Sequence, residues 1–154
     1  MERVVKKLIS INKTISTMES CTGGAIANEI TNIPDASRVI KFSAVTYSNE
    51  YKIKMGVDEK LINKYSVYSI EVARDMAKTI SLFTNSNYGV GVTGKLKKVD
   101  ENNFSGEDDV VFLSIYDRDL DKYFDSKIKL NFDTRTDNKK QIVEKFIENF
   151  LKIS

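Results

Sequence analysis

The sequence predicts an α/β fold in three layers, in which helices cover both faces of a mixed, mostly parallel sheet that ends in an antiparallel hairpin. Two observations predict it. Helical and extended patterns alternate up to residue 94, in the order helix, strand, helix, strand, helix, strand. The rest of the chain shows a strand hairpin followed by one long amphipathic helix. We expect a single domain over residues 1–154, because this length suits one hydrophobic core.

The first half of the chain supplies two strands and their flanking helices. Helical spacing of apolar residues marks the first helix, and β-branched runs mark the strands. Pro34 ends the second helix, because proline lacks a backbone donor and disfavours helix at the residue before it. The expected elements are a helix over residues 2–12, a strand over 14–17, a helix over 23–32, a loop over 34–37 and a strand over 39–47.

The second half begins with helices and ends with strands and a helix. Ser69 is the expected N-cap of a strong helix that carries apolar residues as far as Phe83. The near-continuous apolar run at 110–116 predicts the central strand, and the charged residues of 95–109 predict a solvated loop. The other expected elements are helical turns over 49–55 and 58–64, strands over 88–94 and 124–132, and a last helix with apolar stripes over 142–151.

Charge and residue usage exclude several classes of function. The chain has 24 Lys and Arg against 22 Asp and Glu, so a net charge of +2 gives little electrostatic reason to expect nucleic acid or an anionic membrane as partner. It contains no histidine, which removes the Ser-His-Asp triad and the common zinc sites. Any acid–base catalysis must therefore be supplied by Lys, Tyr, Asp, Glu or water.

Cysteine usage and hydropathy point to a cytoplasmic location. The single cysteine, Cys21, excludes an internal disulfide framework and any multi-cysteine metal site, and we expect it to pack as a small buried side chain. No apolar stretch is long enough to span a bilayer, and the charged N-terminus leads into an amphipathic pattern, not a signal-peptide core.

A polar turn at residues 19–24 (Glu-Ser-Cys-Thr-Gly-Gly) follows the first expected strand and precedes a helix. Ser20 and Thr22 offer hydroxyls that suit a nucleophile, a helix cap or a phosphate ligand. Gly23 and Gly24 allow a ligand to approach the backbone closely. The backbone N–H groups of the turn suit an oxyanion and the start of the helix suits a phosphate, and the sequence leaves both uses open.

Two further strands end in small polar residues. Residues 46–48 (Thr-Tyr-Ser) close the second expected strand, and Thr93 with Gly94 closes the third. In sheets of this kind ligands sit at the carboxyl ends of the strands. We therefore expect these segments and the turn at 19–24 to meet at one edge of the sheet.

These motifs, taken in order, resemble the CinA C-terminal domain family, which includes the nicotinamide-nucleotide amidases, also called nicotinamide mononucleotide deamidases. The resemblance rests on residues 19–24, on 45–50 (Val-Thr-Tyr-Ser-Asn-Glu) with Lys52, on Ser69 before its helix, and on 92–94 (Val-Thr-Gly). It covers nearly the whole chain and implies a stand-alone domain, since the family's nucleotide-processing N-terminal domain does not precede it.

The resemblance implies hydrolysis of a nucleotide carboxamide to a carboxylate and ammonia, without a metal or other cofactor. Ser20 stands where the family has its proposed nucleophile, and Tyr47 and Lys52 stand where it has the proposed activating pair. Such a pair needs a lysine whose pKa is lowered by burial or by a nearby cation. The resemblance also implies self-association into a homo-oligomer. The residues expected to bind the substrate are Thr22, Gly23, Gly24, Ser69, Thr93 and Arg135.

Some family features are replaced in this chain. After Thr93-Gly94 the family's amidases continue into a glycine-rich loop, where this chain has the bulky, charged residues 95–101. Near the last helix only Arg135 remains of a Gly-Asp-Arg motif, and Lys139 stands where a second arginine is usual. The altered loop motivates a second hypothesis, a catalytically inactive or substrate-shifted relative that binds a nucleotide or small molecule. The family's name suggests a third, a competence or damage-inducible accessory protein.

Overall fold

Alternating helices and strands build the α/β fold that the sequence predicts. The computed structural model describes residues 1–97 and 104–153. Its elements are α1 (Glu2–Ser10), β1 (Ile15–Glu19), α2 (Ala25–Thr31), η1 (Ala36–Arg38), β2 (Ile40–Val45), α3 (Asn49–Lys54), α4 (Glu59–Tyr65), α5 (Ile70–Thr84), β3 (Tyr88–Gly94), β4 (Val110–Asp117), β5 (Lys122–Lys129) and α6 (Arg135–Lys152).

The described residues form a five-stranded sheet with the order β2-β1-β3-β4-β5. Strand β1 pairs in parallel with β2 and β3, whereas β4 pairs antiparallel with β3 and β5, which confirms a mixed sheet that ends in an antiparallel hairpin. The expectation of a central strand at 110–116 is wrong, because β3 occupies the middle position. Strand β4 is apolar because helices cover both faces of the sheet, not because it lies at the centre.

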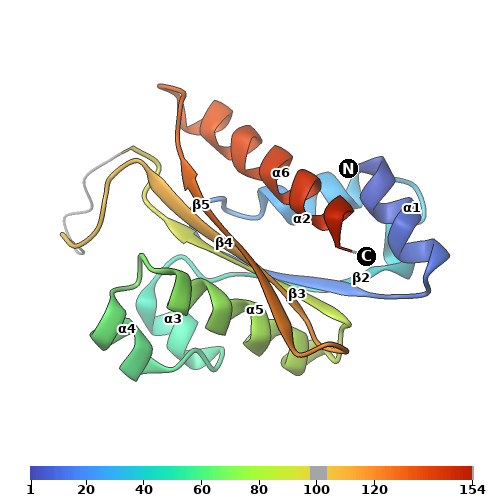
Figure 1. Ribbon diagram of the computed structural model, residues 1–154, viewed down its shortest axis with the longest axis horizontal. Helices are drawn as coiled ribbons and strands as arrows, with labels where there is room; N and C mark the ends of the chain where they lie inside the picture. Colours follow the sequence, from blue (N-terminus) through green and yellow to red (C-terminus); the bar gives the residue numbers. More distant parts are fainter. Residues whose placement is uncertain (98–103, 154) are drawn as a thin grey trace.

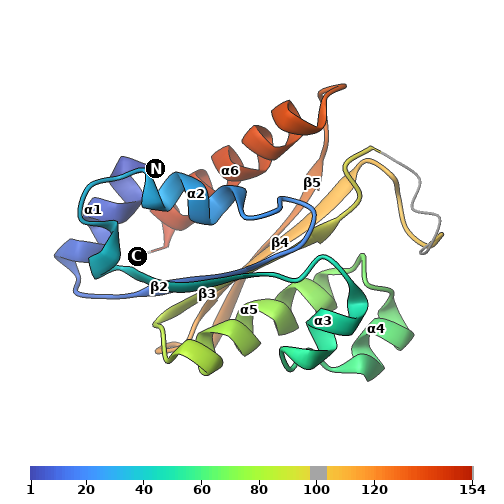
Figure 2. The same cartoon turned by 180° about the vertical axis from the view of Figure 1, so that it is seen from behind.

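Helices pack on both faces of this sheet. α1, α2 and α6 lie over one face (Figure 1), and α3, α4 and α5 lie over the other (Figure 2). Each face has its own hydrophobic core, with Phe146 fully buried in the first and Met76 in the second. A Cβ atom at Gly91 would lie 2.0 Å from the carbonyl oxygen of Ala73, so glycine in β3 allows α5 to approach the sheet closely.

Three local expectations need correction. The loop expected at 34–37 contains the 3-10 turn Ala36–Arg38. Strand β5 ends at Lys129 and not at 132, because side chains of α6 bind the next N–H groups: Gln141 accepts from Asn131 at 3.0 Å and Asn138 from Phe132 at 3.1 Å. The loop expected at 95–109 is not solvated throughout, since Lys95 and Leu96 are buried, and its residues 98–103 lie outside the described residues.

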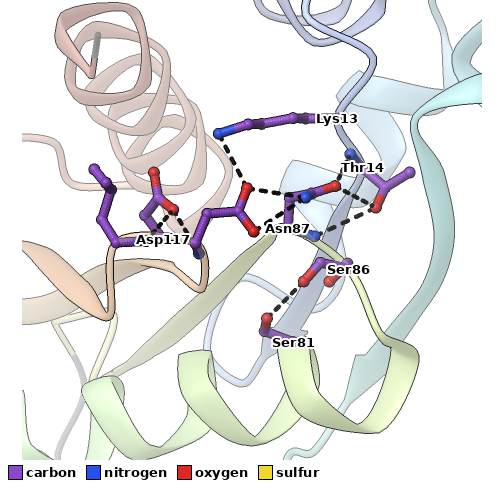
Figure 3. Close-up of polar contacts among 8 residues, drawn as sticks. Lys13, Thr14, Ser81, Ser86, Asn87 and Asp117 are labelled. Carbon is purple, nitrogen blue, oxygen red and sulfur yellow. Dashed lines mark hydrogen bonds and ion pairs between the residues drawn. The ribbon is translucent and has the colours of Figure 1, made fainter.

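A polar network fixes the end of the sheet at which β1 and β3 begin (Figure 3). Asn87 accepts the N–H of Thr14 at 3.0 Å through Oδ1 and donates through Nδ2 to the Asp119 carboxylate at 3.1 Å. Lys13 pairs with the same carboxylate at 3.2 Å, and Asp117 accepts the Asp119 N–H at 3.0 Å. The network therefore ties the turn before β1 and the start of β3 to the β4–β5 hairpin.

Candidate active site

The three polar strand ends meet at one edge of the sheet, as the sequence predicts. Beyond the last pair of the ladder, the Ser20 N–H donates to the Val92 carbonyl at 3.1 Å and the Thr46 N–H donates to the Glu19 carbonyl at 2.9 Å. The ends of β1, β2 and β3 are thereby held side by side. The residues that follow these strands therefore lie close together.

Lys52 reaches Ser20 from helix α3. Its Nζ donates to the Ser20 Oγ at 3.0 Å and to the Thr46 carbonyl oxygen at 2.8 Å. The lysine is only 1% exposed, and this burial lowers its pKa from 10.5 to about 8. A hydroxyl and a lysine amine with a lowered pKa within hydrogen-bond reach of one another form the arrangement that activates a serine nucleophile.

Local sequence explains how Lys52 reaches this position. Ser48 caps α3 by accepting the Tyr51 N–H at 3.3 Å, so the helix begins directly after the end of β2. Lys52 then lies one turn into α3, on the side that packs against the sheet, while Lys54 two residues later is exposed and paired with Glu50.

Glu19 has a structural role in the turn that the sequence reasoning missed. Its buried carboxylate accepts the N–H groups of Ile26 at 3.1 Å and Ala27 at 2.9 Å, and the Thr17 hydroxyl at 3.1 Å. The start of α2 is therefore already occupied, which argues against its expected use as a phosphate site. The sequence signal is one acidic residue at the end of an otherwise uncharged strand, directly before the turn that leads into a helix.

The two glycines of the turn adopt left-handed conformations, with φ of 62° at Gly23 and 92° at Gly24. The Gly23 N–H donates to the Ser20 carbonyl at 3.0 Å, which closes the turn. A Cβ atom at Gly23 would lie 3.3 Å from the Nζ of Lys139, so the ammonium group of α6 sits against the turn. Among the described residues, no backbone carbonyl accepts the N–H groups of Cys21 and Thr22.

Tyr47 follows β2, and its hydroxyl is directed to α6. Its side chain is 65% exposed, and its hydroxyl accepts from Arg135 at 3.2 Å. Within the part of the chain that the structure describes, this hydroxyl bonds to neither Ser20 nor Lys52. Arg135 opens α6 and Lys139 follows one turn later, so both cations face the same edge. The expected pairing of Tyr47 with Lys52 stays a prediction.

The other predicted hydroxyls differ in their surroundings. Thr93 donates to the Val67 carbonyl at 2.8 Å, and Ser69 donates to the Ser66 carbonyl at 2.8 Å while capping α5. The Thr93 hydroxyl thus ties the loop before α5 to the end of β3, and the Ser69 hydroxyl closes a turn within that loop. The Thr22 and Thr46 hydroxyls are buried and have no hydrogen-bond partner among the described residues.

Cys21 is packed inside this site as expected. The thiol is buried, and burial raises its pKa to about 12, so it stays protonated near neutral pH. That protonation state disfavours Cys21 as a nucleophile. Across residues 1–97 and 104–153, no group of three or more His, Cys, Asp or Glu side chains is placed to hold a metal ion. In the same ranges no helix has the length and apolarity to cross a bilayer.

The CinA C-terminal domain matches residues 1–153. The chain belongs to this family. Two relatives carry the name "Putative competence-damage inducible protein": one from Alkaliphilus oremlandii is 47% identical over 94 residues, and one from Clostridium perfringens is 44% identical over 96. These alignments cover 60% and 61% of this chain but only 23% of each relative, so the chain spans about a quarter of the relatives it matches.

Solved CinA-superfamily structures have the same fold. A competence/damage inducible protein, CihA, from Agrobacterium tumefaciens aligns with a TM-score of 0.87 and 26% identity, covering 97% of this chain and 90% of that one. A CinA superfamily protein from Escherichia coli aligns with a TM-score of 0.90 over 99% of this chain and 87% of that one. Its identity is 19%, so this second likeness speaks for the fold alone.

Proposed function

We propose that the protein is an amidohydrolase that resembles nicotinamide mononucleotide deamidase, with Ser20 as the nucleophile and Lys52 as the base. The observation that carries the proposal is the 3.0 Å contact between the Ser20 hydroxyl and a buried lysine whose pKa is lowered to about 8. Near neutral pH a useful fraction of that amine is unprotonated and able to accept a proton.

The reaction follows from this contact. Lys52 removes the Ser20 proton while Oγ attacks the carboxamide carbon, and we assign the stabilisation of the resulting oxyanion to the N–H groups of Cys21 and Thr22. The proton passes from Lys52 to the amide nitrogen, the C–N bond breaks and ammonia leaves. Water then hydrolyses the Ser20 ester, which releases the carboxylic acid and restores the hydroxyl.

An anionic group on the substrate fits the other side of the turn. Arg135 and Lys139 lie on one face of α6, Arg135 bonded to the Tyr47 hydroxyl and Lys139 against Gly23. Within the described residues neither cation has a carboxylate partner within ion-pair distance. Guanidinium and ammonium groups in this position suit a phosphate monoester. A nucleotide amide carries both the phosphate and the carboxamide.

The proposal is tested by measuring ammonia release from nicotinamide mononucleotide. The variants are Ser20→Ala and Lys52→Met, with Lys54→Met as the matched control because Lys54 lies on the same helix but is exposed. We expect turnover by the wild type and by Lys54→Met, and a loss of at least about 10³-fold in the other two. Unchanged turnover in Ser20→Ala would refute the nucleophile assignment.

A second candidate function is a nucleotide-binding or regulatory module, which is suggested by the bulky, charged segment that stands where the family's amidases have a glycine-rich loop. Lys95, in the segment that replaces the family's glycine-rich loop, has a side chain only 2% exposed and pairs with Asp108 at 3.1 Å. Its Nζ also lies 5.2 Å from the centre of the Tyr68 ring. This candidate predicts thermal stabilisation by the mononucleotide without release of ammonia.

A further inference from the structure

The Lys52 amine and the Thr46 hydroxyl are two incompletely paired groups inside the site. A protonated lysine amine has three hydrogens to donate, and Lys52 has two acceptors among the described residues, the Ser20 Oγ and the Thr46 carbonyl. The Thr46 hydroxyl belongs to the same residue as that carbonyl, and it has no hydrogen-bond partner. Buried polar groups are normally hydrogen-bonded, so the third hydrogen of the Lys52 ammonium and the unpaired Thr46 hydroxyl both need an explanation.

Strand geometry directs the Thr46 side chain towards α3. The ring of Phe42 in β2 lies 5.5 Å from that of Phe83 on α5. Ala44 packs into the core on the same face of the sheet, the face that α5 covers. Side chains alternate along a strand, and Thr46 continues the ladder by one residue, so its side chain faces the same layer. Lys52 enters from that layer.

The burial of Thr46 favours a contact with Lys52 over a contact with a bound ligand. Thr46 is 2% exposed and its hydroxyl oxygen is sealed from solvent, so a bound molecule does not reach it without opening the site. Lys52 is already inside, and its Nζ has spare hydrogen-bonding capacity. The Thr46 side chain can rotate about χ1 and the lysine stem is flexible, and a pairing of the two groups would require such a side-chain movement.

We propose that the Thr46 hydroxyl accepts the third hydrogen of the Lys52 ammonium group and so acts as a positioning residue for the proton transfer. The Ser20 O–H bond breaks, an N–H bond forms on Nζ, and Thr46 then holds the ammonium until its proton passes to the leaving nitrogen. The role in turnover rests on the proposed amidohydrolase function. The pairing of Thr46 with Lys52 does not, because it requires only protonation of the amine.

The test measures the pKa of Lys52 by NMR titration of its ε-methylene group in the substrate-free protein. The signal is identified by its loss in Lys52→Arg. Among the described residues, the Cys21 thiol acts on the pKa of Lys52, and Glu19 and Arg135 act on the pKa of that thiol. All three groups are retained in the variants that are compared. Removing an acceptor of the charged form lowers a lysine pKa, so Thr46→Val is expected to lower that of Lys52 by about one unit.

Two variants complete the comparison. Thr46→Ser keeps the hydroxyl and is expected to keep the wild-type pKa. Ser16→Ala is the matched control, because the Ser16 hydroxyl is also buried without a partner but lies near the other end of β1, and it is expected to leave the pKa unchanged. If Thr46→Val does not fold, Thr46→Ala removes the same hydroxyl with a smaller side chain.

The outcomes are distinct. An unchanged pKa in the variants that lack the Thr46 hydroxyl overturns the proposal, and so does an equal fall in Thr46→Ser, which would make the lost methyl group the cause. A fall in Ser16→Ala as well would mean a general loosening of the core and would also overturn it. Since the titration uses no substrate, its result stands apart from any failure to release ammonia. Where ammonia is released, Thr46→Val is expected to move the acid limb of the kcat/KM profile about one pH unit lower.

Discussion

The Lys52 amine contacts the Ser20 hydroxyl at 3.0 Å although 32 positions separate the two residues. The contact exists because α3 starts at the end of β2 and Ser20 lies at the end of the neighbouring β1. A pairing that depends on two adjacent strand ends is a property of the fold.

Turnover is expected to depend on pH through Lys52. Only the neutral amine accepts the Ser20 proton, and burial places the pKa at about 8. The value of kcat/KM should therefore fall about tenfold per pH unit below pH 8 and reach a plateau above it. Lys52→Arg should abolish activity at every pH, because a guanidinium does not deprotonate. A profile without an acid limb near pH 8 would contradict the assignment of Lys52 as base.

The same lysine is expected to make stability depend on pH. Its pKa in the folded state, about 8, lies below the ordinary value of 10.5, so the unfolded chain binds more protons between these two values. The wild-type free energy of unfolding should rise by about 3 kcal/mol relative to Lys52→Met as the pH rises through that window. Urea denaturation at both ends of the window measures it. The raised pKa of Cys21 is present in both proteins and largely cancels, and a constant difference would refute the expectation.

The order of elements could be predicted from sequence because local patterns determine it. Hydrophobic periodicity, Pro34 and the glycine turns locate most helices and strands, and parallel strand ends then have to share an edge. Strand position within the sheet could not be predicted in the same way. The apolar run of β4 looked central, whereas the true centre, β3, has Gly89 and Gly91 where α5 approaches.

Contacts among the candidate site residues were harder to predict from the sequence than the sheet edge at which the residues lie. Ser20 and Lys52 meet as expected, but Tyr47 bonds to Arg135, which lies 88 positions away, and sequence spacing does not reveal such a contact. Glu19 was missed because its carboxylate caps α2 from the preceding strand, whereas the usual capping signal lies within a few residues of the helix start. Lys95 was expected in a solvated loop, yet Asp108 and Tyr68 allow it to be buried.

Glu19 is expected to contribute to stability. In Glu19→Gln the side chain keeps its shape but loses the charge and one of the oxygens that accept from Ile26 and Ala27. The free energy of unfolding should fall by about 2–3 kcal/mol, since hydrogen bonds to a buried charged group are lost. The exposed Glu29→Gln on α2 is the control and should change it by less than about 0.5 kcal/mol. Equal effects of the two variants in urea denaturation would argue against this cap.

The network at the opposite end of the sheet separates stability from catalysis (Figure 3). Asn87→Ala removes the contacts with Thr14 and Asp119 and should cost about 2 kcal/mol of unfolding free energy. Because these residues lie where β1 and β3 begin, away from Ser20, kcat at a temperature where the variant is folded should stay within about twofold of wild type. A large loss of kcat in the folded variant would mean that the two ends of the sheet are coupled.

Arg135 is expected to determine the preference for a phosphate. In Arg135→Met the substrate phosphate loses its guanidinium partner, so KM for nicotinamide mononucleotide should rise about 10–100-fold, while KM for nicotinamide riboside, which has no phosphate, should hardly change. Lys140→Met is the control on the same helix, since Lys140 is 70% exposed and paired with Asp137 at 3.4 Å. An equal rise for both substrates would instead assign Arg135 to holding Tyr47 in place, because the lost 3.2 Å contact affects the two substrates alike.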